Sequence, residues 1–368
     1  MTNSRFDRLT GRLDGSGLDA VALNAGPTLS YLTGLQFHLS ERPSVLLVSA
    51  TGEKALLIPE LEAGKTAGLD ASIRVFPYGE NPASWAEVFR SAAGALGLTS
   101  PVIGVEPTRF RFLEQNLLQT ALPQARFVSA DALLSQARIA KDEAEVAVMR
   151  EAVRIAQVAF ERTLPAFKIG VTEREIASEL SLQLLKAGSS AEFPFNPIVA
   201  GGPNSANPHA VPGGRAFQAG DLVVIDWGAS YQGYISDLTR MVAFGPLDPE
   251  LEQIHKIVLE SNRAGSAAAF PGIAAGDIDA ASRGVIERAG YGQYFIHRTG
   301  HGIGMEGHEP PYIFAGNPIA LEPGMAFTVE PGIYLPGRGG VRIEDNLVIT
   351  AQGVEVLTDL PRELFFIS

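Results

Sequence analysis

Carboxylates and one imidazole recur between Asp221 and Thr350, each on or beside a run of strand-type residues. A buried charge is costly unless it is paired, so acids held in strand-rich segments need cations as partners. Several carboxylates with one imidazole suit hard divalent ions, manganese first, with cobalt, iron and zinc as competitors. The sequence therefore predicts a two-metal site built from Asp226, Asp237, His301, Glu330 and Glu344.

The two aspartates can share an ion if they lie on one hairpin. Asp226 ends an apolar run at 222–225, and Asp237 follows eleven positions later. A two-residue turn at Tyr231–Gln232 would place the two side chains directly opposite each other, whereas a turn at Gln232–Gly233 would make them diagonal neighbours. Both registers put the two carboxylates on one face of the sheet, whereas a three-residue loop without a bulge would send them to opposite faces.

The residues around the expected ions suit chemistry at a carbonyl group. Two ions about 3.5–4 Å apart can hold a bridging hydroxide and polarise a carbonyl together. Glu330 precedes Pro331–Gly332 at a strand end, where it could bind metal and accept the proton of the bridging water. Arg342 and Glu344 are two residues apart and should share a strand face. Three histidines in glycine- and proline-rich segments could stabilise an oxyanion or carry protons: His209, His297 and His308.

The elements that position these groups are expected in the second of two domains. A length of 368 residues predicts two domains, which we place at 1–136 and 137–368. The first has α/β patterning and no catalytic group of its own. It has helical spacing at 81–96, a hairpin turn at 51–53 and apolar runs that predict strands at 21–23, 44–48, 54–58 and 101–105.

The second domain contains two similar helix pairs. Amphipathic spacing predicts a helix over 142–167, and Thr172 opens a capping box for the next one. The later pair is expected to begin at 248–249 and near Asp277. The second helices of the two pairs match at a constant offset of 102, and two of the acids follow each pair. We interpret this as an internal repeat whose halves hold one site between them.

Composition limits the partners and the compartment. The formal net charge is −12, which disfavours nucleic acid and anionic membranes. The absence of cysteine excludes disulfides and thiolate ligands. The first residues lack the apolar run of a signal peptide, and no run approaches membrane-spanning length. We therefore expect a cytoplasmic protein, with a homodimer as its assembly.

With these residues the sequence resembles the pita-bread metallopeptidases, in particular their proline-specific branch of Xaa-Pro dipeptidases (prolidases) and Xaa-Pro aminopeptidases. The most specific block is 297–309, and the resemblance covers essentially the whole chain. It implies an α+β fold, with a smaller α/β creatinase-like N-terminal domain before a pita-bread catalytic domain of pseudo-two-fold symmetry. It also implies two manganese, cobalt or zinc ions, and hydrolysis of the imide bond before the second-position proline of small peptides.

The resemblance assigns roles to single residues. The five ligand candidates match the metal ligands of the family, and 208–210 matches a histidine segment that lines the site. The histidine corresponding to His308 contacts substrate and assists proton transfer, and Tyr334 and Arg342 fall at site positions. A proline ring needs an apolar wall, for which 193–195 and Tyr334 are candidates, although Phe193 and Phe195 could equally belong to the core.

Three alternatives share the fold. Methionine aminopeptidases use the same ligand types but usually lack a creatinase-like N-terminal domain. Creatinase works without the metal ligands, and a metal-free binding scaffold predicts the loss of at least one. All five ligand candidates are present here, which favours the proline-specific branch.

The length of the peptide substrate is left open. Larger prolidases are expected to hold the substrate carboxylate with an arginine between the metal histidine and the first metal glutamate, but Thr299–Gly337 contains no lysine or arginine. Arg42, helped by His38, is the candidate anchor for this carboxylate. Pro43 holds the backbone of Arg42 in an extended conformation, and the planar guanidinium can bind a carboxylate through two parallel hydrogen bonds. A surface pair with Glu41 is the alternative. A prolidase is slightly favoured over an Xaa-Pro aminopeptidase.

Overall fold

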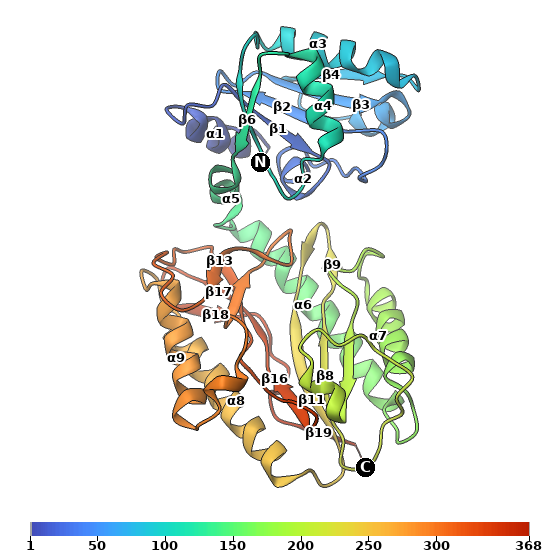
Figure 1. Ribbon diagram of the computed structural model, residues 1–368, viewed down its shortest axis with the longest axis vertical. Coiled ribbons are helices and arrows are strands. Elements are labelled where there is room, and N and C mark those ends of the chain that lie inside the picture. Colours follow the sequence, from blue (N-terminus) through green and yellow to red (C-terminus); the bar gives the residue numbers. More distant parts are fainter. Residues whose placement is uncertain (1, 368) are drawn as a thin grey trace. The chain divides into compact units, whose positions relative to one another are not determined.

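The computed structural model describes residues 2–367, with side chains from residue 5 onward. The chain divides into two compact units, Met1–Arg138 and Ile139–Ser368, which run from blue to green and from green to red in Figure 1. Among the described residues, no helix is long and apolar enough to cross a membrane.

The N-terminal unit is built on a six-stranded mixed sheet in the order β4-β3-β2-β1-β5-β6. Its strands are β1 (Ala20–Asn24), β2 (Val45–Ser49), β3 (Lys54–Pro59), β4 (Ile73–Tyr78), β5 (Val102–Val105) and β6 (Arg126–Ser129). Its α-helices are α1 (Thr2–Leu13), α2 (Pro27–Thr33), α3 (Trp85–Ala95), α4 (Phe112–Ala121) and α5 (Asp131–Arg138). Helices α3 and α4 cover one face of the sheet (Figure 1), and Phe89 and Leu118 lie in the core beneath them.

The four strands expected in this unit are confirmed, and so is the hairpin between β2 and β3. The helix expected over 81–96 begins later, at Trp85. Pro82–Ser84 form a 3-10 turn instead, because the Asn81 side chain accepts a hydrogen bond from the Ala83 amide and closes a tighter turn.

The C-terminal unit has two helix pairs on the outside and strands between them (Figure 1). The helices are α6 (Glu143–Thr163), α7 (Glu173–Ala187), α8 (Pro249–Ala268) and α9 (Ala275–Arg288). One sheet has the order β19-β11-β8-β7, with β7 (Ile198–Gly201), β8 (Leu222–Trp227), β11 (Leu238–Phe244) and β19 (Phe365–Ile367). The other has the order β13-β12-β14-β17-β18, with β12 (Gly300–Gly302), β13 (Glu309–Ile313), β14 (Ala326–Val329), β17 (Asp345–Ile349) and β18 (Val354–Val356). Two short hairpins complete the unit: β9 (Ser230–Tyr231) with β10 (Tyr234–Ile235), and β15 (Gly332–Leu335) with β16 (Gly339–Arg342).

The caps that start these helices follow the sequence pattern. Asp142 and Thr172 each form a capping box, and Asp248 accepts the amide hydrogen of Glu250 before Pro249. The first helix ends at Thr163, four residues earlier than expected. Pro165 has no amide hydrogen to continue the helix, and Leu164–Ala166 tighten into a 3-10 turn.

The internal repeat is confirmed in the backbone. Gly170 and Gly272, 102 positions apart, both adopt positive φ, at 90° and 87°. The Gly170 amide donates to the carbonyl of Phe217 at 2.9 Å, and the Gly272 amide donates to that of Leu321 at 2.7 Å. We call 143–244 the first half and 249–349 the second half. In both halves a helix pair leads into an inner strand that ends at the site, β8 in the first and β14 in the second.

Candidate metal centre

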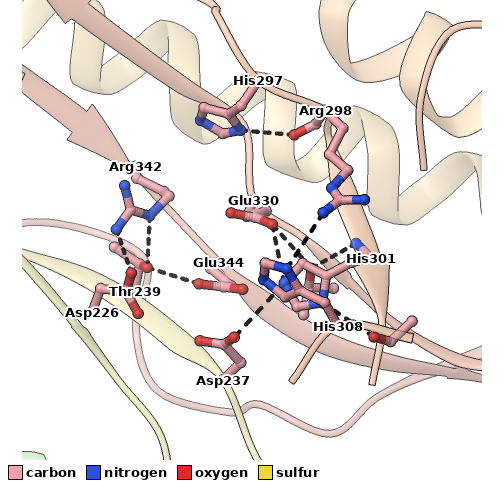
Figure 2. A network of polar contacts seen from close by, with 12 residues as sticks. Asp226, Asp237, Thr239, His297, Arg298, His301, His308, Glu330, Arg342 and Glu344 are labelled. Atoms are coloured by element: carbon pink, nitrogen blue, oxygen red, sulfur yellow. Dashed lines mark hydrogen bonds and ion pairs between the residues drawn. The ribbon is translucent and has the colours of Figure 1, made fainter. Parts of the chain in front are cut away.

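Asp226 and Asp237 come from the hairpin that joins β8 to β11. Its turn is Gln232–Gly233, with φ values of 47° and 83°, which a two-residue primed turn requires. This register pairs Asp226 with Thr239 and makes Asp237 a diagonal neighbour. Of the two registers considered from the sequence, the one with the turn at Tyr231–Gln232 is therefore wrong. Both carboxylates still meet on one face (Figure 2).

The second half brings three more candidate ligands to the same place. Glu330 follows β14 directly, Glu344 lies between β16 and β17, and His301 is on β12. His301 Nε2 lies 3.3 Å from Glu330 Oε1 and 3.7 Å from Asp237 Oδ2. One ligand atom each from Asp237, His301 and Glu344 lie within 4.8 Å of one another. Figure 2 shows these side chains converging on a common centre.

His301 presents a lone pair to the acids. Its Nδ1 lies 3.1 Å from the carbonyl oxygen of Gly302, and because a carbonyl only accepts, Nδ1 must carry the proton. Nε2 is then unprotonated and faces Asp237 and Glu330. Burial lowers the pKa of His301 to about 3. An acceptor nitrogen facing acceptor oxygens is repulsive until a cation lies between them, which is the arrangement of a metal-ligating histidine.

Burial disfavours the ionised form of these acids when no cation is close to them. It raises the pKa of Asp226, Asp237 and Glu344, and it raises that of Glu330 to about 8. Among the described residues, Asp226 Oδ1 and Glu344 Oε1 have no hydrogen-bond partner. Among the side chains that the structure describes, Arg342 is the one guanidinium that pairs with these acids, at Asp226. The surplus of negative charge and the two unpartnered oxygens fit bound divalent cations.

Arg342 begins a directed hydrogen-bond chain beside the ligands. Its Nη1 donates to the Tyr334 hydroxyl at 2.8 Å, and that hydroxyl lies 2.9 Å from His297 Nε2. His297 Nδ1 is 2.7 Å from the carbonyl of Arg298 and must donate to it. Both nitrogens of His297 are thus occupied, and burial lowers the pKa of its ring to about 4. Burial also raises the pKa of Tyr334 to about 12. His297 is therefore placed to orient Tyr334, and its catalytic role stays a prediction.

A cavity of about 540 Å³ opens over Asp226 and Asp237. His209 and His308 line it, and the His308 ring contacts the His301 ring in a tilted arrangement with centroids 4.0 Å apart. The cavity also has an apolar wall, formed by Pro194, Phe195, Ile198, Ala210, Val211 and Pro212. Of the two positions considered for Phe193, the cavity wall is wrong and the core is correct, because Phe193 packs against the core of the first half.

Comparison with known proteins gives the family. The model of metallopeptidase family M24 matches residues 147–351, and that of the creatinase/prolidase N-terminal domain matches residues 5–140. The chain belongs to metallopeptidase family M24. The expected creatinase-like N-terminal domain and pita-bread catalytic domain are confirmed by these matches and by the solved structures that the enzyme resembles.

The relatives of this M24 enzyme include both dipeptidases and an aminopeptidase. An Xaa-Pro dipeptidase of Lactobacillus delbrueckii subsp. lactis is 35% identical over 363 residues, or 98% of each chain. A dipeptidase from Pyrococcus horikoshii OT3 is 38% identical, with a TM-score of 0.93 over 99% of this chain and 100% of the other. An X-Pro aminopeptidase from Thermotoga maritima MSB8 is 31% identical, with a TM-score of 0.84 over 97% of this chain and 100% of the other.

The candidate anchor for a substrate carboxylate, Arg42, has partners within the N-terminal unit. Its Nε lies 3.1 Å from both carboxylate oxygens of Glu80, and a second nitrogen pairs with Glu41. The pair with Glu41, considered from the sequence as the alternative, is therefore present. His38 is exposed in the same loop. A substrate carboxylate at Arg42 would have to compete with Glu80.

Three residues near the ligands were missed from the sequence. Thr239 Oγ1 donates to Glu344 Oε2 at 2.8 Å, and Asn346 Oδ1 accepts the Asp237 amide hydrogen at 3.1 Å. Arg298 lies beside His308 (Figure 2), with its Nη2 3.4 Å from His308 Nδ1. Arg298 belongs to the block that carried the family resemblance, but nothing local signals where its side chain points.

Proposed function

We propose that this M24 enzyme hydrolyses the Xaa-Pro imide bond at the N-terminus of short peptides with two divalent ions, manganese favoured and cobalt or zinc possible. The observation that carries the proposal is the convergence of three buried acids and the partly buried Glu330 with the unprotonated Nε2 of His301. These residues supply enough carboxylate oxygens for two ions, and the ions supply Lewis acidity and an activated water.

The acids of the chain then have separate tasks. Asp226, Asp237, His301 and Glu344 hold the ions. Glu330 also holds metal, and it accepts the proton of the attacking water, a role that its position between His301 and Thr328 supports. Burial in a site of this kind excludes bulk water and strengthens each of these interactions.

The histidines and the cavity wall act on the peptide. His209 and His308 line the cavity next to Asp226 and Asp237, where they donate hydrogen bonds to the scissile carbonyl oxygen as charge develops on it. Tyr334, held by Arg342 and His297, fixes the position of Arg342 on Asp226. The wall at Pro194 and Phe195 packs against the proline ring, which has no amide hydrogen that needs a partner.

Dipeptides are the favoured substrates, with longer peptides cut by an Xaa-Pro aminopeptidase as the alternative. Relatives with both names have the same fold. A homodimer and a cytoplasmic location stay predictions from the sequence, to be checked by light scattering and by cell fractionation.

The test uses metal-stripped enzyme to which manganese, cobalt or zinc is restored, assayed on Ala-Pro, Ala-Pro-Ala and Ala-Ala. We expect rapid hydrolysis of the two proline peptides, slow hydrolysis of Ala-Ala, and close to two bound metal equivalents per chain. Comparable rates on Ala-Pro and Ala-Ala would contradict the proline assignment. Full activity after exhaustive chelation would contradict the role of the metals.

A further inference from the structure

The candidate site is short of positive charge for a substrate that ends in a carboxylate. Four acids surround the expected ions, and an Xaa-Pro dipeptide carries its own carboxylate on the proline Cα, next to the scissile imide nitrogen. A cation with free hydrogen-bond donors is needed to hold that group in place. Because this need exists only for Xaa-Pro cleavage, the inference rests on the proposed function.

Two of the nearby arginines are already occupied. Arg342 contacts Asp226, the Thr239 hydroxyl at 3.1 Å and the Tyr334 hydroxyl at 2.8 Å. Arg283 holds both oxygens of Asp279, at 3.0 and 3.1 Å, and two backbone carbonyls. Neither guanidinium can bind a second carboxylate without leaving its present buried acid unpaired, which is costly.

Arg298 is differently placed. Its guanidinium carbon lies over the Tyr312 ring, 4.4 Å from the ring centroid, and this cation–π contact helps to hold the guanidinium in place. Its Nη2 lies 3.4 Å from His308 Nδ1, a long contact. Within residues 2–367 the structure shows no carboxylate paired with Arg298. The fork is therefore oriented by an aromatic ring and has donors to offer.

The neighbours of Arg298 place it at the correct end of the substrate. His308 contacts the ring of the candidate metal ligand His301 and lines the cavity, so a scissile carbonyl bound there lies beside His308. In a dipeptide only the imide nitrogen and the proline Cα separate that carbonyl carbon from the terminal carboxylate. A carboxylate at the end of the dipeptide would therefore lie close to the Arg298 guanidinium, which is next to His308. Figure 2 shows the Arg298 side chain pointing toward the His308 ring, with Glu330 nearby.

We propose that Arg298 binds the C-terminal carboxylate of the dipeptide and is a residue that determines the preference for dipeptides. The bidentate match of guanidinium and carboxylate favours a substrate that ends at proline. A third residue in the substrate would replace the charge with a neutral amide and lose this contact.

The experiment compares Ala-Pro with its neutral C-terminal amide, Ala-Pro-NH2, in wild-type enzyme and in Arg298→Gln. We expect wild-type enzyme to prefer the free acid. In Arg298→Gln the ratio of the two kcat/KM values should fall at least tenfold, about 1.4 kcal/mol, mainly through KM of the free acid. Arg298→Lys should lie between the two, because an ammonium group keeps the charge but loses the fork.

Matched arginine variants separate this inference from its rivals. Arg154→Gln, which removes an exposed ion pair with Glu151 on α6, should leave the ratio at the wild-type value. An equal fall on both substrates in Arg298→Gln would show that Arg298 only positions His308, and would overturn the inference. Collapse of the ratio in Arg42→Gln but not in Arg298→Gln would assign the carboxylate to Arg42. If wild-type enzyme cut neither substrate, the proposed function itself would fail.

Discussion

The two halves of the catalytic unit share a backbone plan and differ in what they bring to the site. Each half places one acid at the end of its inner strand, Asp226 near the end of β8 and Glu330 directly after β14, and a second acid on the chain that follows. The strands that precede the inner strands in the chain and pair with them differ. In the first half β7 has the sequence Ile-Val-Ala-Gly, whereas in the second half β12 carries His301. The repeat thus accounts for the acid positions, and β12 adds the imidazole.

The halves also hold each other's acids. Contacts that cross between them include Arg342 with Asp226, Asn346 with the Asp237 backbone at 3.1 Å, and Thr239 with Glu344 at 2.8 Å. Arg240 of the first half is also fully buried against Asp345 of the second, at 2.7 Å. A charge that is buried needs its partner in place, so neither half can present its ligands correctly without the other.

The largest expected effect is the loss of one ligand from each half. Asp237→Asn and Glu344→Gln keep side-chain size but remove a charge from the cluster. Lewis-acid stabilisation by a bound ion contributes several kcal/mol, so we expect kcat/KM to fall by about 10³-fold or more in each variant. Elemental analysis should show the loss of at least one metal equivalent. If one variant kept its metals and its activity, the halves would not contribute equally.

A smaller effect is expected from the two cavity histidines, one in each half. His209→Ala and His308→Ala should each lower kcat by roughly 10²-fold, the scale of losing a positioned acid or oxyanion donor. Metal content should stay near normal, because the ligand set is complete without them. A His308→Ala protein that lost its metals would instead make His308 a ligand, and the second half would then contribute two imidazoles.

The smallest effect tests the contacts that cross between the halves. Thr239→Val is isosteric but removes the donor to Glu344 and the acceptor for Arg342. Groups that orient ligands usually change metal affinity by about 10–100-fold, and we expect the lower end because the carboxylate itself remains. Thr163→Val is the control, since Thr163 is buried on α6 and, among the described residues, its hydroxyl donates only to the Ala159 carbonyl. Equal metal affinities in the two variants, measured by competition with a chelating dye, would argue against this role of Thr239.

Local patterns in the sequence predicted most of the fold that matters for the site. The strand runs, the capping boxes at Asp142 and Thr172 and the repeat offset of 102 all appear in the structure. The acids were placed on one sheet face because side chains in a strand alternate with a period of two. The same rule could not choose between the two hairpin registers, since both turns contain Gln232 and differ in whether Tyr231 or Gly233 is the other turn residue; in the structure it is Gly233.

The sequence alone determined the types of the ligand candidates, their strand context and the family resemblance, because these depend on residue identity and on spacings of a few positions. The tertiary structure decided that Phe195 lines the cavity while Phe193 joins the core, and that Arg42 pairs with Glu80. It also placed Arg298 against Tyr312 and Arg342 against Asp226, 116 positions away. Such contacts depend on how distant strands pack, and no local pattern encodes which side chains will meet there.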